Sequence, residues 1–365
     1  MGKKKYCRGS IGSTFARCGE DKKEFPSPKI PATKDKTGNK KDAHIEVCLK
    51  YNVETSVKSG FETIRLLSDF PDFSFEEIST EAGFLSKKIA MPLIISPLTG
   101  GGKLSQRIND ILSEAAEALN IGMAVGSQKL MLDNAVPADS FLVRHSAPSI
   151  PLLSNLGIIH VRKGKEYLLR AVESIQADGI ILYVNPVQEV LQDSGEKDFT
   201  GILAGLEEIL DTFPYPVFLK EVGFGLSEKL LSWAGRNKIR GVDVAGLGGT
   251  NWAKIECLIS GADYELYETL GIKTTEAIIA SRKYLTEDRY LIASGGIRTG
   301  LDIAKALAMG ADIVSMGLPF LKWASESVER VTSEVRRLQE QLKIAMWFTG
   351  SKDVNALRNK FQRES

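Results

Sequence analysis

The sequence has few of the residues that build disulfide scaffolds or histidine-based active sites, with 4 cysteines and 3 histidines in 365 residues. Cys7, Cys18, Cys48 and Cys257 show no CxxC spacing, so we expect reduced thiols, a cytoplasmic location and no cysteine-bound metal. Neither a run of about 18 to 20 apolar residues nor the apolar core of a secretory signal occurs. We therefore expect no membrane partner.

Net charge is also scarce, since 47 Lys/Arg face 46 Asp/Glu. This balance argues against nucleic acid as a partner. Locally the charge is uneven: residues 1–41 hold 12 Lys/Arg and 4 Asp/Glu, against 35 and 42 in the rest. Because residues 1–39 are poor in aliphatic side chains, they are expected to form a basic, mobile tail, with a phosphate-attracting arm as the alternative.

From residue 91 onward, apolar runs of strand length alternate with stretches of helical period. The expected strands are 92–96, 122–125, 152–155, 180–184, 217–220, 242–245, 291–294 and 313–316. The expected helices are 104–119, 167–175, 201–210, 228–233, 275–284 and 302–308. Eight repeats in roughly 250 residues predict an α/β fold, a (β/α)8 TIM barrel with a short N-terminal extension. An open doubly wound sheet is the alternative.

The barrel is expected to span residues 91–345. A phosphate-clamp arm and lead-in are expected over 40–90, and a C-terminal helix or tail over 346–365. The segment 324–347 either covers the barrel or forms an interface between subunits.

In such barrels the active site is built from the loops that follow the strands. Glycines cluster after the sixth, seventh and eighth expected strands, at Gly246, Gly248, Gly249, Gly295, Gly296 and Gly317. Glycine lets the backbone approach an anion closely, so these loops predict a phosphate-bearing cofactor, for which FMN is the natural candidate. Lys220, at the end of the fifth strand, can stabilise an anionic reduced flavin.

Polar side chains follow the fourth expected strand, where Asn185, Gln188 and Glu189 lie close in sequence. One carboxylate suffices for Mg²⁺ when substrate phosphates complete its shell. Motifs of other enzyme classes (GxSxG, the Walker loop, HExxH) are missing. Of the histidines, His145 is expected in a polar loop, and His160 is expected to satisfy a local hydrogen bond.

Eight ordered stretches carry a family resemblance. They are 40–44 (KKDAH), 98–101 (LTGG), 125–128 (VGSQ), 155–157 (NLG), 185–189 (NPVQE), 220–227 (KEVGFGLS), 243–252 (DVAGLGGTNW) and 295–298 (GGIR). Together they resemble the type 2, FMN-dependent isopentenyl diphosphate isomerases over residues 40–320.

The resemblance implies isomerisation of isopentenyl diphosphate to dimethylallyl diphosphate in isoprenoid biosynthesis, with reduced FMN, Mg²⁺, and NADPH only to reduce the flavin. It implies Gln188 in proton transfer and Glu189 as the Mg²⁺ ligand. The implied substrate-binding residues are Lys40, Lys41, His44, Lys129, Asn185, Ser227 and Trp252. The implied FMN-binding residues are Thr99, Gly100, Gly101, Ser127, Asn155, Lys220, Thr250, Gly295, Gly296 and Gly317. A homo-oligomer, tetramer or octamer, is also implied.

Three departures from the family pattern lie around the anion site. Tyr183 stands where the family usually has histidine, and Lys40 and Lys129 stand where it usually has arginine. Lysine keeps the charge but lacks the planar, bidentate fork. Two alternatives therefore stay open: a homologue repurposed for a related prenyl-type diphosphate, and an FMN-dependent oxidoreductase on the same barrel.

Overall fold

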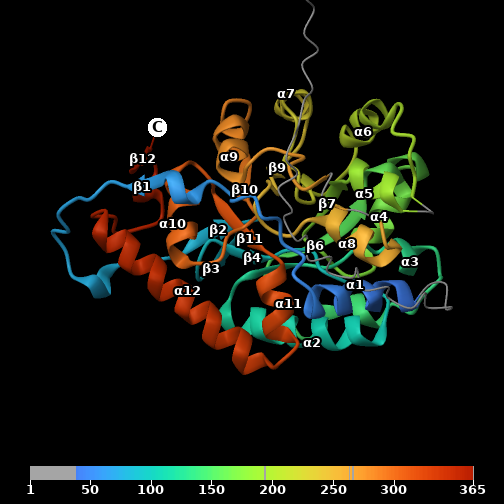
Figure 1. Ribbon diagram of the computed structural model, residues 1–365, viewed down its shortest axis with the longest axis horizontal. Coiled ribbons are helices and arrows are strands. Elements are labelled where there is room, and N and C mark those ends of the chain that lie inside the picture. Colours follow the sequence, from blue (N-terminus) through green and yellow to red (C-terminus); the bar gives the residue numbers. More distant parts are fainter. Residues whose placement is uncertain (1–37, 193–194, 263, 265–266, 365) are drawn as a thin grey trace, which may run out of the picture.

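A closed barrel of eight parallel strands forms the centre of the molecule (Figure 1). The computed structural model describes residues 38–192, 195–262, 264 and 267–364. The barrel strands are β4 (Leu93–Ile95), β5 (Gly122–Ala124), β6 (Leu152–Gly157), β7 (Gly179–Val184), β8 (Val217–Glu221), β9 (Gly241–Asp243), β10 (Tyr290–Ala293) and β11 (Ile313–Met316). Their order is β10-β11-β4-β5-β6-β7-β8-β9. The predicted barrel is confirmed, and the open-sheet alternative is wrong.

Helices alternate with these strands and cover the barrel (Figure 1). They are α1 (Gly38–Lys50), α2 (Lys103–Leu119), α3 (Lys129–Leu132), α4 (Lys165–Glu173), α5 (Pro186–Leu191), α6 (Ile202–Leu210), α7 (Glu228–Arg236), α8 (Trp252–Ser260), α9 (Thr274–Arg282), α10 (Gly300–Ala308), α11 (Leu318–Ala324) and α12 (Val328–Phe348). All six predicted helices are confirmed to within a few residues. Of the described helices, none is both long and apolar enough to cross a membrane.

The barrel interior is filled at the amino-terminal ends of the strands. A hairpin of β2 (Ala82–Phe84) and β3 (Lys87–Ile89) lies there. Its Phe84 is fully buried and packs against Phe218 and Tyr290, with ring centroids 5.7 and 5.0 Å apart. The same cluster includes Ile94, Ala124, Leu153, Ile181, Ile292 and Ile313. This end of the barrel is therefore closed by apolar packing, which leaves the opposite end for a site.

The C-terminal part of the chain is tied to the barrel. Helix α12 packs against α2, α10 and α11 and so covers the barrel (Figure 1), although Ile344 and Phe348 on it are exposed. The helix runs without a break across residue 346, where a boundary was expected. Beyond it, β12 (Phe361–Arg363) pairs antiparallel with β1 (Ile64–Leu66).

The N-terminal tail expected over residues 1–39 lies outside the described residues up to residue 37. Helix α1 begins at Gly38 and packs against α8 and α2. It brings residues from the expected clamp arm to the mouth of the barrel.

Candidate active site

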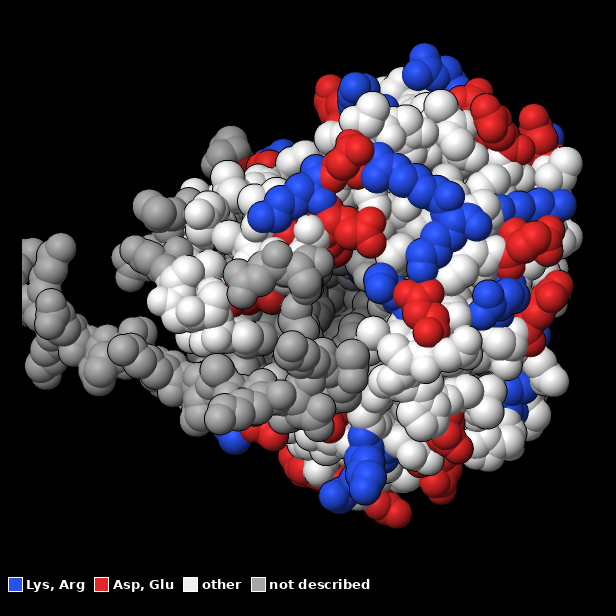
Figure 2. Space-filling view, turned by 90° about the vertical axis from the view of Figure 1, so that its right-hand side faces the viewer, with Lys and Arg blue, Asp and Glu red and all other residues white. Residues whose placement is uncertain are grey.

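A cavity of about 400 Å³ opens at the carboxyl ends of the barrel strands. Figure 2 shows a hollow in this face, with Lys/Arg and Asp/Glu side chains beside it. Most of the residues predicted for the site line this one cavity. They are His44, Thr99, Ser127, Lys129, Asn155, Asn185, Gln188, Glu189, Lys220, Thr250, Trp252, Gly295, Gly296 and Gly317.

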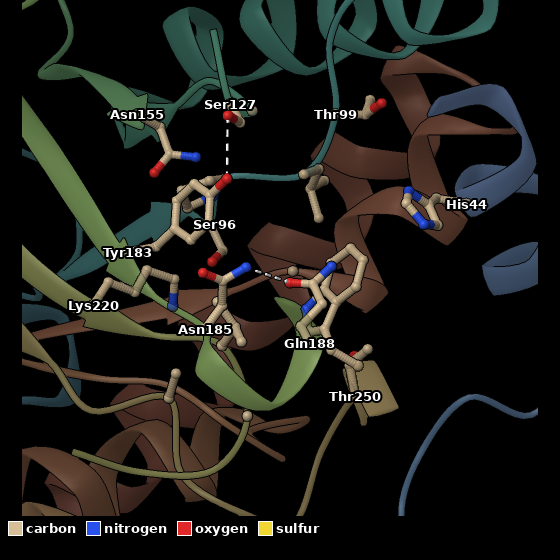
Figure 3. Close-up of a pocket in the computed structure, with 18 of the residues that line it drawn as sticks. His44, Ser96, Thr99, Ser127, Asn155, Tyr183, Asn185, Gln188, Lys220 and Thr250 are labelled. Carbon is tan, nitrogen blue, oxygen red and sulfur yellow. Dashed lines mark hydrogen bonds between the residues drawn. The ribbon is translucent and has the colours of Figure 1, made fainter. Parts of the chain in front are cut away.

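Helix α5 presents the cluster predicted after the fourth barrel strand. Asn185 holds the N-cap position without a capping hydrogen bond from its side chain, and Pro186 occupies the first turn, where no backbone N–H is needed. The Asn185 Nδ2 donates to Gln188 Oε1 at 3.1 Å (Figure 3). It also donates to Glu189 Oε1 at 2.9 Å. Among the described residues there is no group of three or more His, Cys, Asp or Glu arranged to hold a metal. Glu189 shares the cavity wall with a second carboxylate, Glu196, whose N–H donates to Glu189 Oε2 at 2.8 Å.

Glu256, on α8, joins three elements of the site. Its Oε1 accepts from Gln188 Nε2 at 2.9 Å and from Gln192 Nε2 at 2.6 Å, and lies 3.2 Å from His44 Nε2. Burial alone would raise the pKa of Glu256, but His44 and the two amides bring that pKa below its usual value. The carboxylate is thus ionised at neutral pH and holds Gln188 in place. His44 also meets the Trp252 ring edge-on at 5.6 Å.

Lys220 lies at the end of β8 and points into the cavity (Figure 3). The sequence placed it beside Glu221, but its Nζ pairs with Asp243 Oδ2 at 2.9 Å and donates to Ser294 Oγ at 3.3 Å. Glu221 turns to the backbone instead, where its Oε2 accepts from the N–H groups of residues 222, 223 and 224. Burial raises the pKa of Glu221 to about 7. The Lys220 ammonium group is therefore held in a fixed position in the cavity lining.

Strands β6 and β7 supply two further polar side chains to the cavity, Asn155 and Tyr183. Asn155, at 4% exposure, has a buried Oδ1 with no hydrogen-bond partner. Gln128 Oε1 accepts from the Asn155 N–H at 3.1 Å and so fixes the strand end. The Tyr183 hydroxyl donates to Ser127 Oγ at 3.3 Å (Figure 3), and burial raises the pKa of Tyr183 to about 12. Tyr183 is therefore a neutral phenol at any working pH.

The glycine loops after β9, β10 and β11 line the third side. Gly295 and Gly296 have φ of 103° and 70°. A Cβ on Gly295 would lie 2.2 Å from the carbonyl oxygen of Gly246, and one on Gly296 would lie 2.3 Å from that of Gly248. Only glycine fits two loops packed this closely, and the result is a narrow backbone cradle. Arg298, which follows it, also lines the cavity, and its Nε donates to Glu54 at 3.0 Å.

Charged side chains form a cluster between α3 and the 3-10 helix Ile158–Lys163. Asp133 accepts from Lys163 at 2.7 Å, from the Tyr167 hydroxyl at 2.9 Å and from Lys129 at 3.2 Å. Burial opposes the ionisation of Asp133, but these donors lower its pKa to about 2. Lys129 is thus held at the cavity by a permanent negative charge.

Three predicted residues do not line the cavity. Ser227 is exposed, and its hydroxyl accepts from the N–H of Leu230 as the cap of α7. Gly100 and Gly101 are not part of the cavity lining, and the N–H of Gly101 donates to Ser140 Oγ at 2.7 Å. The side chains of Lys40 and Lys41, in the first turn of α1, lie outside what the structure describes.

Sequence reasoning missed three residues of the site. A signal existed for Glu256 and Asp243, since each is a lone carboxylate in an apolar run, IECLI and VDVA. The third is His160, which was expected to satisfy a local hydrogen bond. That expectation is wrong: neither ring nitrogen has a hydrogen bond among the described residues, and the side chain lines the cavity at 4% exposure.

The fold matches that of known proteins. The family model described as FMN-dependent dehydrogenase matches residues 269–364. A solved structure of an oxidised active mutant of (S)-mandelate dehydrogenase has a TM-score of 0.63 at 17% identity, covering 88% of this chain and 99% of that chain. A mandelate oxidase structure with (S)-4-hydroxymandelic acid has a TM-score of 0.61 at 14% identity, covering 88% and 95%. These likenesses show the fold class, a (β/α)8 barrel.

Curated relatives define the family. The chain is 38% identical over 329 residues to the isopentenyl-diphosphate delta-isomerase of Mycolicibacterium gilvum, covering 88% of this chain and 95% of the relative. It is 40% identical over 335 residues to that of Thermococcus kodakarensis, covering 87% and 89%. It is 37% identical over 330 residues to that of Rickettsia bellii, covering 87% and 95%. The chain belongs to the isopentenyl-diphosphate delta-isomerase family.

Proposed function

We propose that this enzyme isomerises isopentenyl diphosphate to dimethylallyl diphosphate with reduced FMN. One observation carries the proposal: in a chain of this family, a single cavity brings the Asn185–Gln188–Glu189 cluster together with Lys220 and the glycine cradle. An amide pair, a carboxylate, a buried cation and a phosphate cradle are the groups that a flavin and a diphosphate require together.

The residues of the cavity fit FMN. Asn155 offers a buried oxygen without a partner to a ring N–H, and Lys220 offers a cation held at one place. The close-packed loops at Gly295 and Gly296 leave no room for a side chain, and both glycines line the cavity, where their backbone would meet the phosphate. Reduced FMN, when bound, supplies a group that exchanges a proton with substrate without net redox chemistry. The residues that would hold it are Thr99, Ser127, Asn155, Lys220, Thr250, Gly295, Gly296 and Gly317.

Gln188 is the proposed partner in proton transfer. Its two amide atoms are both engaged, Oε1 with Asn185 and Nε2 with the ionised Glu256, so the amide has one orientation. A fixed orientation matters because proton transfer requires the groups to meet within hydrogen-bond distance. Glu256 is a positioning residue in this scheme.

The diphosphate is proposed to bind between α5, α3 and α1. Glu189 would hold Mg²⁺, and since the described residues offer no group of three or more His, Cys, Asp or Glu, phosphate oxygens would supply most of the other ligands. Lys129, Asn185 and His44 line the adjoining wall, with Trp252 beside His44. Lys40 and Lys41 keep their proposed role from the sequence. Ser227 is not retained, because its hydroxyl caps α7.

NADPH as the reductant of the flavin, a cytoplasmic location and a homo-oligomer of four or eight subunits stay predictions from the sequence and its resemblance. So does the absence of nucleic acid among its partners.

The proposed function is tested by incubating the purified protein anaerobically with FMN, NADPH, Mg²⁺ and isopentenyl diphosphate. We expect the two isomers to reach equilibrium, and we expect omission of flavin or of Mg²⁺ to stop the reaction. A protein that holds flavin and leaves isopentenyl diphosphate unchanged contradicts the proposal.

The fold likeness to mandelate dehydrogenase favours one second candidate, an FMN-dependent oxidoreductase of 2-hydroxy acids. Among the described residues no histidine follows β8 or β9, where such an enzyme would need a base near the flavin. We expect 2-hydroxy acids to leave the oxidised flavin spectrum unchanged. Bleaching of the flavin by such an acid would favour the oxidoreductase.

A further inference from the structure

His160 is a buried side chain at the cavity that the proposed chemistry has not used. It lies on the 3-10 helix Ile158–Lys163, directly after β6, and is 4% exposed. Its ring meets Tyr167 edge-on at 6.0 Å, and neither nitrogen has a hydrogen-bond partner among the described residues. Its nitrogens are not among the fully enclosed polar atoms without a partner in the described residues, so the edge of the ring is open to the cavity. An imidazole that lines a cavity without a partner therefore points to a ligand.

The charges around His160 indicate the sign of that ligand. Lys129 and Asp133 face it from α3, Lys163 from its own helix and Tyr167 from α4. Two lysines against one carboxylate leave an excess of positive charge. Burial and these lysines lower the pKa of His160 to about 4, so its ring is neutral and carries one N–H donor at neutral pH.

The position of His160 separates it from the flavin phosphate. Strand β6, which precedes it, lies four strands from β10 in either direction around the barrel. The glycine cradle that follows β10 is therefore across the mouth, whereas Lys129 is on the same side as His160. An anion bound at this wall is distinct from the phosphate of the cofactor.

We propose that His160 is a substrate-binding residue whose ring N–H donates to a phosphate oxygen of the diphosphate, beside Lys129. The inference rests on the proposed function for the identity of the substrate. Tyr183, on β7, stands where the family usually has a histidine. His160 follows the neighbouring strand β6, so it would supply an imidazole to the diphosphate from a different position.

The test uses the FMN-loaded enzyme and inorganic diphosphate with Mg²⁺, titrated by calorimetry. His160→Phe keeps a ring of similar size and removes the donor, and His160→Leu is made in parallel in case one variant fails to fold. Since a hydrogen bond to a charged group is involved, we expect the Kd for diphosphate to rise at least about tenfold in either variant. His160→Gln, which restores an N–H donor, is expected to recover most of the affinity.

The matched control is His145→Phe, because His145 is exposed and lies outside the cavity. It should bind diphosphate as the parent does, and all variants should keep their flavin content. Unchanged diphosphate affinity in the folded His160 variants, or loss of flavin from them, overturns the inference. A parent enzyme that binds diphosphate through His160 but does not isomerise isopentenyl diphosphate would refute the proposed function alone.

Discussion

Gln188 has both ends of its amide engaged, Oε1 by Asn185 and Nε2 by Glu256. We predict that Gln188→Ala lowers kcat by about 10²- to 10⁴-fold, the usual contribution of a positioned proton-transfer group. Flavin content should be retained, because the amide lies on α5 and the proposed flavin cradle lies on other loops. Steady-state kinetics with absorbance at the flavin band measures both quantities.

Gln192→Ala is the matched control for that variant. Gln192 also donates to Glu256, at 2.6 Å, and also lines the cavity. Its loss should cost much less in kcat, because the Gln188 amide keeps its own two partners. If both variants lose turnover equally, Gln188 has no special place in proton transfer and the Glu256 cluster is only structural.

The residues of the site could be predicted where they follow strands in sequence. Asn185 directly follows β7 and is the N-cap of α5, which holds Gln188 and Glu189, so these three residues are close because they are close in sequence. Glu256 and Asp243 could not be paired with their partners in advance. Glu256 contacts side chains from α1 and α5. Asp243, on β9, pairs with Lys220 on the neighbouring strand β8. Both contacts form only when the barrel has assembled.

At the scale of elements, the strands were predictable because each is a buried apolar run, as parallel strands are. The helices α3, α5 and α11 were not, since four to seven residues are too few to show a helical period. Helix α5 is one of these, and it presents Gln188 and Glu189. The loops that carry function are therefore the part that local patterns describe least.

The packing of the glycine loops gives a prediction at this scale. Gly296→Ala should raise the Kd for FMN at least about tenfold, because a Cβ there would lie 2.3 Å from the Gly248 carbonyl and move both loops. Gly201→Ala is the control, since Gly201 has a similar φ of 73° and a Cβ on it would meet nothing within 4 Å. Fluorescence titration of the apoprotein with FMN compares them. Equal affinities in the two variants would show that the cradle does not bind the cofactor.

The packing of the hairpin β2–β3 gives a second prediction at the scale of elements. Phe84→Ala should lower the free energy of unfolding by about 3–5 kcal/mol, because it leaves a cavity under the barrel floor. Phe70→Ala should change it by less than about 0.5 kcal/mol, since Phe70 is 82% exposed. Urea denaturation measures the difference. The KM for substrate should stay the same in both, and a large rise in KM for Phe84→Ala would show that the hairpin is coupled to the site.

For the whole molecule, the two ends of the barrel have separate tasks. The end that the hairpin closes is apolar and contributes stability, and the mouth gathers the polar and charged groups. Around the mouth, the glycine cradle and the wall of Lys129 and His160 lie on opposite sides. Such an arrangement can hold a flavin phosphate on one side and a diphosphate on the other, with Lys220 and Gln188 between them.

The central claim is isomerisation without net redox chemistry, and one anaerobic sample tests it. Isopentenyl diphosphate and Mg²⁺ are added to the reduced, FMN-loaded enzyme, and the product is followed by NMR while the flavin absorbance is recorded. The account predicts many molecules of dimethylallyl diphosphate per flavin, with the flavin still reduced at the end. Flavin that stays bound while no product forms, or product that appears only in proportion to flavin oxidised, would contradict it.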